Sequence, residues 1–150
     1  MSLEEVPVQV RNILQRKGNE VISVPPQETL QETARVLREN KIGAVLVRDG
    51  TGKMVGVISE RDLVIAIAKH GGGVLENKVA EFMTEGVYTC SLDDDVKSVM
   101  EKMTSRRIRH LPVVDADNIV GIISIGDAVK QRIAETEAEA EALKAYIATG

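Results

Sequence analysis

The apolar positions of this chain change their spacing in a regular order, which predicts short strands alternating with short helices. Residues 21–24 are a short apolar run closed by two prolines, as expected for a strand. Helical spacing then starts at about Thr29 and stops near Gly43. The buried face of this predicted helix is formed by Leu30, Ala34 and Leu37, with Val36 at its margin.

A hairpin and a second helix are predicted next. Residues 44–47 and 54–58 are apolar runs on either side of Asp49-Gly50-Thr51-Gly52, a sequence typical of a hairpin turn. Residues 62–68 have helical character, and Ser59 stands where its side chain can cap that helix. The first half of the chain is therefore expected to contain three strands and two helices.

The second half repeats this order. A short helical segment that stops near Gly18 is matched later in the chain, since the apolar residues Val10, Ile13 and Leu14 return as Val79, Phe82 and Met83. A strand then recurs at residues 87–90 and a helix at 96–103. A hairpin follows, in which strands 111–114 and 119–123 are joined by a turn at 115–118.

The repetition is clearest where each hairpin ends. Residues 56–62 read Gly-Val-Ile-Ser-Glu-Arg-Asp, and residues 121–127 read Gly-Ile-Ile-Ser-Ile-Gly-Asp. A β-α-β-β-α order carried twice predicts an α+β fold of two small units that are joined through their sheets, with helices packed against the sheets. We expect a first repeat at residues 1–73, a second at 74–130 and a helical extension at 131–150. One repeat alone would bury too little apolar surface to be stable.

Composition then narrows the possible functions. The chain of 150 residues carries 19 basic and 23 acidic side chains, a net charge of −4, and contains no tryptophan. Without a basic field or stacking aromatics, nucleic-acid binding is not expected. Cys90 is the only cysteine, which excludes an internal disulfide and favours an inert strand residue. No apolar stretch approaches the roughly 20 residues of a membrane helix, and we expect a cytoplasmic protein without a membrane partner.

Two features of the sequence carry a resemblance to a known family: the duplicated Gly-x-x-Ser-x-x-Asp endings and the segment Arg109-His110-Leu111-Pro112-Val113-Val114. In both, the chain resembles a tandem pair of CBS domains, the module named after cystathionine β-synthase. The resemblance extends from about Val10 to Lys130. It implies a pseudo-two-fold pair of repeats with small mixed sheets packed against helices. It also implies two clefts for adenosine-containing ligands (AMP, ADP, ATP, NAD(H) or S-adenosylmethionine) and, commonly, a homodimer.

The resemblance also implies roles for particular residues. Asp62 and Asp127 would accept hydrogen bonds from the ribose hydroxyls, and Ser59 and Ser124 would reach ribose or phosphate. A helix that starts at the serine offers N–H groups and a positive dipole end to an anion, which agrees with this assignment. Adenine would lie between the two strands that begin with Val21-Ile22 and with Val87-Tyr88-Thr89.

The two implied clefts differ in charge. In the second repeat Arg109 and His110, with Arg106 and Arg107 nearby, would meet phosphate, whereas the matching positions of the first repeat are Gly43 and Ala44. Arg61 would partly compensate in the first repeat, where the second has Gly126. The clefts are therefore not expected to be equivalent for phosphate.

Each candidate site residue also has a purely structural interpretation. Ser59 and Ser124 would cap helices, with Asp62 and Asp127 completing each cap. The arginines would form a solvated helix end, and His110 would be a packing residue. The acidic run at residues 93–95 is interpreted as a helix start rather than a metal site, and the glycines at 71–73 as a flexible joint between the repeats.

The chain continues beyond Asp127 as a predicted helix to about Ala148. Its apolar positions alternate in steps of four and three, the spacing of a coiled-coil seam, at Val129, Ile133, Thr136, Ala140, Leu143 and Ile147. This helix would pack on its own domain or, as we prefer, against the same helix of a second subunit.

No catalytic constellation is present in the sequence. We therefore expect a regulatory, non-enzymatic module without a catalytic cofactor, which binds an adenine nucleotide or NAD(H) between the repeats and signals to an unknown regulated protein. The alternatives are a dimerisation scaffold with empty clefts and an S-adenosylmethionine sensor. An enzyme acting on nucleotides would instead show turnover of ATP or NAD.

Overall fold

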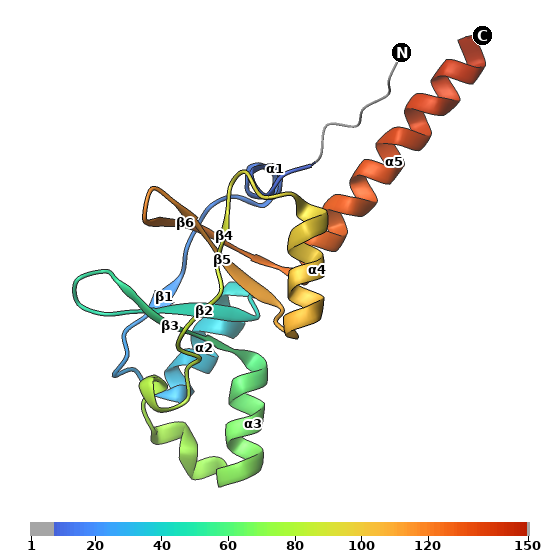
Figure 1. Ribbon diagram of the computed structural model, residues 1–150. Coiled ribbons are helices and arrows are strands. Elements are labelled where there is room, and N and C mark those ends of the chain that lie inside the picture. The colour runs from blue at the N-terminus through green and yellow to red at the C-terminus, as the bar shows by residue number, and fades with distance from the viewer. Residues whose placement is uncertain (1–7, 150) are drawn as a thin grey trace. The chain divides into compact units, whose positions relative to one another are not determined.

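The computed structural model describes residues 8–149, which fold into two compact units. One unit consists of residues 20–88, and the other combines residues 8–19 with residues 89–149. Each unit has a three-stranded mixed sheet with helices packed against it (Figure 1). The architecture is therefore α+β and duplicated, as the pattern of the sequence predicted.

The unit of residues 20–88 has its middle strand in the centre of the sheet. Strand β1 (Ser23–Val24) runs parallel to β2 (Ala44–Arg48), and β2 pairs antiparallel with β3 (Met54–Ser59). Helix α2 (Leu30–Asn40) is capped by the Thr29 side chain, and α3 (Glu60–His70) follows β3 directly. Two 3-10 turns, η1 (Gly72–Glu76) and η2 (Val79–Glu81), complete this unit.

The other unit repeats this topology. Strand β4 (Cys90–Ser91) is parallel to β5 (His110–Asp115), which pairs antiparallel with β6 (Asn118–Ser124). Helix α4 (Val96–Arg106) connects β4 to β5, and α5 (Ile125–Thr149) follows β6. Helix α1 (Val10–Lys17) also belongs here, because Val10, Ile13 and Leu14 are buried in this unit's core.

The compact units thus divide the chain differently from its sequence repeats. Helix α1 belongs to the first repeat in sequence but packs with the elements of the second. The matching segment around Val79, Phe82 and Met83 packs into the core of residues 20–88. The reason lies in close packing at the hairpins: an added Cβ on Gly121 would lie 2.7 Å from Leu14 Cδ2, and one on Gly56 would lie 2.6 Å from Met83 Sδ.

The structure differs from the predicted elements at three places. The first strand of each unit has only two residues, so residues 21–22 and 87–89 precede the strands rather than form them. Of the glycines at 71–73, predicted to be a flexible joint between the repeats, Gly71 precedes the 3-10 turn η1 and the other two lie within it, inside the unit of residues 20–88. Thr33, which the apolar pattern did not include, is fully buried on α2, because its hydroxyl donates to the Thr29 carbonyl at 2.9 Å.

Candidate functional site

The first serine–aspartate pair closes the junction between β3 and α3. The Ser59 amide donates to Asp62 Oδ2 at 2.8 Å, and the Asp62 amide donates to Ser59 Oγ at 3.3 Å. Ser59 Oγ also lies 3.0 Å from Asp62 Oδ2. This reciprocal arrangement is a capping box, with aspartate in the position where glutamate is more usual.

The second pair has the same geometry between β6 and α5. The Ser124 amide donates to Asp127 Oδ2 at 2.8 Å, and the Asp127 amide donates to Ser124 Oγ at 3.0 Å. Both aspartates are half-buried, so a carboxylate is held in place at the start of each helix. The capping interpretation is therefore correct for both junctions, which we call the first and the second serine–aspartate turn. A cap does not exclude a ligand role, since a helix start also attracts anions.

The second turn differs from the first in that a lysine from another part of the chain contacts its aspartate. The Lys17 ammonium, in the last turn of α1, donates to Asp127 Oδ2 and to the Ile122 carbonyl, each at 2.8 Å. Both side chains of this ion pair are largely covered, with exposed fractions of 34% for Lys17 and 20% for Asp127. No ion pair among residues 8–149 involves Asp62, and the residue that matches Lys17 in the repeat alignment is Gly86.

The ion pair changes the acidity of Asp127. Burial by itself raises the pKa of this carboxyl group, but the hydrogen bond and charge of Lys17 and the bonds from Ser124 outweigh burial. The net effect is a pKa below the usual range of aspartate. Asp127 is thus a stable carboxylate at neutral pH and can accept hydrogen bonds from hydroxyl groups.

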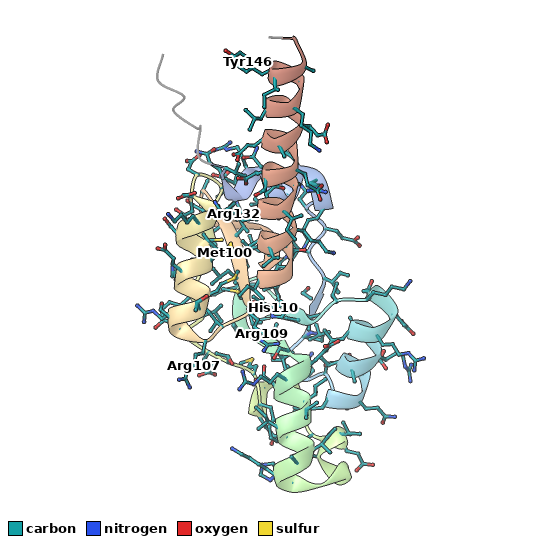
Figure 2. All side chains as sticks on the ribbon, turned by 90° about the vertical axis from the view of Figure 1, so that its right-hand side faces the viewer. Met100, Arg107, Arg109, His110, Arg132 and Tyr146 are labelled. Carbon is teal, nitrogen blue, oxygen red and sulfur yellow. The ribbon has the colours of Figure 1, made fainter. Side chains whose placement is uncertain are left out.

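Strand pairing brings two of the predicted basic residues to the second turn. His110 is the register partner of Ser124, and the Arg109 carbonyl accepts a 2.8 Å hydrogen bond from the amide of Ile125. Arg107 is the left-handed C-cap of α4, with φ of 56°. Figure 2 shows Arg107 at the end of that helix, and Arg109 next to His110, the first residue of β5.

The first turn has the same backbone without the positive charges. Ala44 is the register partner of Ser59, and the Gly43 carbonyl accepts from the Glu60 amide at 2.9 Å. Arg61 is exposed in the first turn of α3. The difference in charge between the repeats, predicted from sequence, is therefore present at equivalent positions of the two turns.

The predicted adenine-binding residues are distributed over both units. Val21 and Ile22 are half-buried beside β2, where the Ile22 carbonyl accepts from the Leu46 amide at 3.3 Å. Thr89 belongs to the unit of the second turn, and its carbonyl accepts from Lys102 Nζ at 3.1 Å. Val87 belongs to the unit of residues 20–88.

Lys17 is the candidate that sequence reasoning missed. In the sequence it belongs to the short helical segment that stops near Gly18, and 110 residues separate it from Asp127. Its place before the terminating glycine marks it as a helix-end cation, but nothing in the local pattern connects it to the second serine–aspartate turn. Only the packing of α1 on β6 and α5 makes that connection.

The cysteine and the acidic run that remain as candidate reactive or metal-binding residues have structural roles. Burial raises the pKa of the Cys90 thiol to about 12, so this cysteine is protonated at neutral pH. Asp95 caps α4, and Asp94 accepts from the Ser91 amide at 2.9 Å. Within the described residues, no cluster of three or more His, Cys, Asp or Glu side chains is arranged to hold a metal ion.

None of the helices in residues 8–149 has the length and apolar character needed to cross a membrane.

The fold and the two turns define a tandem pair of β-α-β-β-α modules, each with a serine and an aspartate at the start of its last helix. Residues 10–69 and 79–133 match the CBS domain family, so the chain belongs to that family. Stand-alone CBS domain pairs are generally regulatory rather than catalytic.

Relatives among curated proteins include the mitochondrial CBS domain-containing protein CBSX3 of Arabidopsis thaliana. It is 33% identical over 127 residues, which are 82% of this chain and 62% of that protein. The CBS domain-containing protein YhcV of Bacillus subtilis is 30% identical, covering 81% of this chain and 86% of that protein. The chain thus spans less than two thirds of the length of the first of these relatives.

Solved structures show the same fold. The CBS-domain containing protein ATU1752 from Agrobacterium tumefaciens has a TM-score of 0.83 and 40% identity, covering 88% of this chain and 98% of that one. The CBS domain pair of MJ0100, solved in complex with 5'-methylthioadenosine and S-adenosyl-L-methionine, has a TM-score of 0.76 and 28% identity. This match covers 86% of this chain and 98% of the MJ0100 chain.

Proposed function

We propose that this chain is a non-catalytic regulatory module that binds adenosine-containing ligands at its two serine–aspartate turns. Asp62 and Asp127 accept hydrogen bonds from the ribose hydroxyls, while Ser59 and Ser124 lie toward ribose or phosphate. The observation that carries this proposal is the pair of half-buried carboxylates held at two helix starts, because a fixed carboxylate is a suitable acceptor for a diol.

Phosphate recognition is proposed at the second turn. Strand pairing places Arg109 and His110 beside it, and Lys17 adds a second permanently charged side chain to that of Arg109. AMP, ADP, ATP and NAD(H) all carry phosphate next to adenosine, so this turn favours them over uncharged adenosine derivatives. At the first turn Arg61 is the nearest predicted cation, so we propose weaker discrimination there.

Adenine is proposed to contact the segments that precede the first strands. Adenine would lie between the segment of Val21 and Ile22 and the segment of Val87 and Thr89. Arg107, at the end of α4, is proposed to contribute at the phosphate end. We further propose that the chain acts as a cytoplasmic homodimer and that ligand binding is read by a separate regulated protein.

An S-adenosylmethionine sensor is the second candidate. It is supported by the MJ0100 structure, whose ligands are S-adenosyl-L-methionine and 5'-methylthioadenosine. These ligands share adenosine with the nucleotides but lack phosphate. Comparing the two groups therefore separates the candidates.

The test is native mass spectrometry of the gently purified chain, followed by thermal shift with AMP, ATP, NADH, S-adenosylmethionine and methylthioadenosine. A ligand present at 100 times its dissociation constant stabilises the folded state by about 2.7 kcal/mol, which a thermal shift resolves easily. Preference for phosphorylated ligands supports the nucleotide sensor. Preference for the sulfur compounds supports the second candidate, and no shift with any ligand supports a scaffold with empty clefts.

Variants then locate the sites. Asp62→Ala and Asp127→Ala each remove a proposed ribose acceptor together with a helix cap. Asp95→Ala is the matched control, since it removes the cap of α4 and lies outside both proposed sites. Unchanged affinity in the Asp62→Ala, Asp127→Ala double variant would rule out the proposed sites.

A further inference from the structure

Helix α5 is much longer than the surface on which it packs. It runs from Ile125 to Thr149, and near its start Ala128 is fully buried while Gln131 and Glu135 are partly covered. From Thr136 to Ala148 every side chain is exposed, a length of about 20 Å at 1.5 Å per residue. Figure 1 shows this part of α5 extending beyond α1 and α4 of the same unit.

An apolar stripe follows α5 on the side turned away from its own unit. Val129, Ile133, Leu143 and Ile147 have exposed fractions of 39%, 53%, 59% and 67%. At 100° per residue the stripe lies roughly 130° around the helix from the face of Ala128, Gln131 and Glu135. The unit's own packing therefore leaves the stripe uncovered.

The stripe has the spacing of a two-stranded coiled coil. Its positions alternate in steps of four and three, with small residues, Thr136 and Ala140, in the middle. Ile133, Ala140 and Ile147 take the a positions, and Val129, Thr136 and Leu143 take the d positions. Isoleucine at a with leucine at d favours parallel dimers, and this combination is present at the end of the stripe, in Leu143 and Ile147.

The charges beside the stripe favour one orientation of a second copy. In a parallel, in-register pair, Arg132 of one chain lies opposite Glu137 of the other, and Glu139 lies opposite Lys144. Because such a dimer is two-fold symmetric, each of these attractive pairs occurs twice. Arg132 is exposed, and Figure 2 shows it on the lower half of α5.

An antiparallel pair of the same length would place like charges together. Lys130 would then lie opposite Lys144, while Glu137 and Glu139 would each lie opposite themselves. Flanking charges mainly set partner and orientation rather than stability. The stripe and its flanks are therefore complementary to a second copy in the parallel orientation only.

We propose that residues 129–147 of two copies of this chain pair as a parallel, in-register coiled coil. This inference rests on the homodimer of the proposed function, and it adds an orientation and a register to the helix pairing expected from the sequence. It is independent of whether any nucleotide binds.

Disulfide trapping tests the register. In a Cys90→Ala background, Thr136→Cys and Leu143→Cys place thiols at two d positions, where the partner's equivalent residue is adjacent. Ala138→Cys is the control, because it lies on the same exposed stretch but outside the stripe. Mild oxidation is expected to link both d-position variants into covalent dimers and to leave the control variant monomeric on a denaturing gel.

The other results overturn the inference in distinguishable ways. Linkage at only one d position indicates an antiparallel pair, which can bring at most one position against itself. If sedimentation shows a dimer but neither variant links more than the control, the dimer exists without this pairing. A monomer in sedimentation overturns the homodimer as well, while ligand binding is judged separately by the thermal shift.

A charge swap provides a second test. Lys144→Glu alone or Glu139→Lys alone places like charges together, and each is expected to raise the dimer dissociation constant severalfold at low salt. The double variant restores opposite charges and is expected to recover the original value. Both residues are exposed, so the fold is not at risk. A double variant as weak as the singles would overturn the parallel register.

Discussion

The ammonium nitrogen of Lys17 lies 2.8 Å from Oδ2 of Asp127, so a lysine near the start of the chain neutralises a carboxylate at the start of its last helix. The same oxygen accepts the Ser124 amide at 2.8 Å. One atom therefore closes a helix cap and binds a cation from another element. The first serine–aspartate turn has the cap alone, which makes the two turns chemically different despite their matching backbones.

Lys17→Met is expected to change which ligand the second turn prefers. The lysine adds positive charge for a phosphate but also competes with ribose hydroxyls for Asp127. Its loss should therefore weaken AMP binding and leave methylthioadenosine binding equal or stronger. We expect the ratio of the two affinities to fall about tenfold, equivalent to about 1.4 kcal/mol. Isothermal titration calorimetry with both ligands measures this ratio.

Two variants serve as controls for that experiment. Lys17→Arg keeps the charge and should keep most of the preference for AMP. Arg16→Met removes a charge from the same helix at a neighbouring exposed position and should change neither affinity. Equal weakening of both ligands by Lys17→Met would show that the lysine acts on the fold rather than on ligand choice.

Asp127 is expected to make stability depend on pH in acid. Its pKa is lower in the folded chain than in the unfolded chain, where aspartate titrates near 3.9. The stabilisation is thus fully present above about pH 4 and is lost as the pH falls through the lower, folded-state pKa. Urea unfolding at pH 7 should show Asp127→Asn to be less stable than wild type by about 1 kcal/mol, typical of a lost charged contact.

The difference between wild type and Asp127→Asn should shrink steadily as the pH is lowered below about 4. Repeating the comparison in a Lys17→Met background should give a smaller difference at pH 7, because the lysine is one cause of the low pKa. A difference that does not change with pH would contradict the assignment of this ion pair.

Gly56 and Gly121 occupy equivalent positions, but alanine should be tolerated differently at each. A Cβ at Gly56 would lie 2.9 Å from the Thr84 carbonyl oxygen, which is backbone and cannot move easily. At Gly121 the nearest atoms are the ends of the Leu14 side chain, which can rotate. We expect Gly56→Ala to destabilise the chain by about 3 kcal/mol and Gly121→Ala by about 1 kcal/mol.

Chemical denaturation of both glycine variants, read by circular dichroism, measures this difference. Leu14→Ala should relieve part of the cost of Gly121→Ala, since it removes the side chain that the new methyl group meets. Equal losses at the two glycines would mean that the backbone around Thr84 adapts as readily as a leucine side chain.

Local patterns of the sequence predict most of the elements. Apolar spacing, turn residues and caps act over a few residues, so the helices, the hairpins and the roles of Ser59 and Ser124 follow from them. Strand pairing within each hairpin also places His110 opposite Ser124. The first strands are shorter than predicted, because an apolar run does not show where hydrogen bonding to β2 or β5 begins.

The sequence alone establishes that the fold is duplicated and that each copy ends in a serine–aspartate turn. Both features can be recognised because they depend on short segments of sequence that repeat. Only the tertiary structure assigns α1 to the unit of the second repeat and brings Lys17 to Asp127. That contact depends on burying Val10, Ile13 and Leu14 against residues far away in the chain. Burial is a property of the whole packed unit, and no local spacing encodes it.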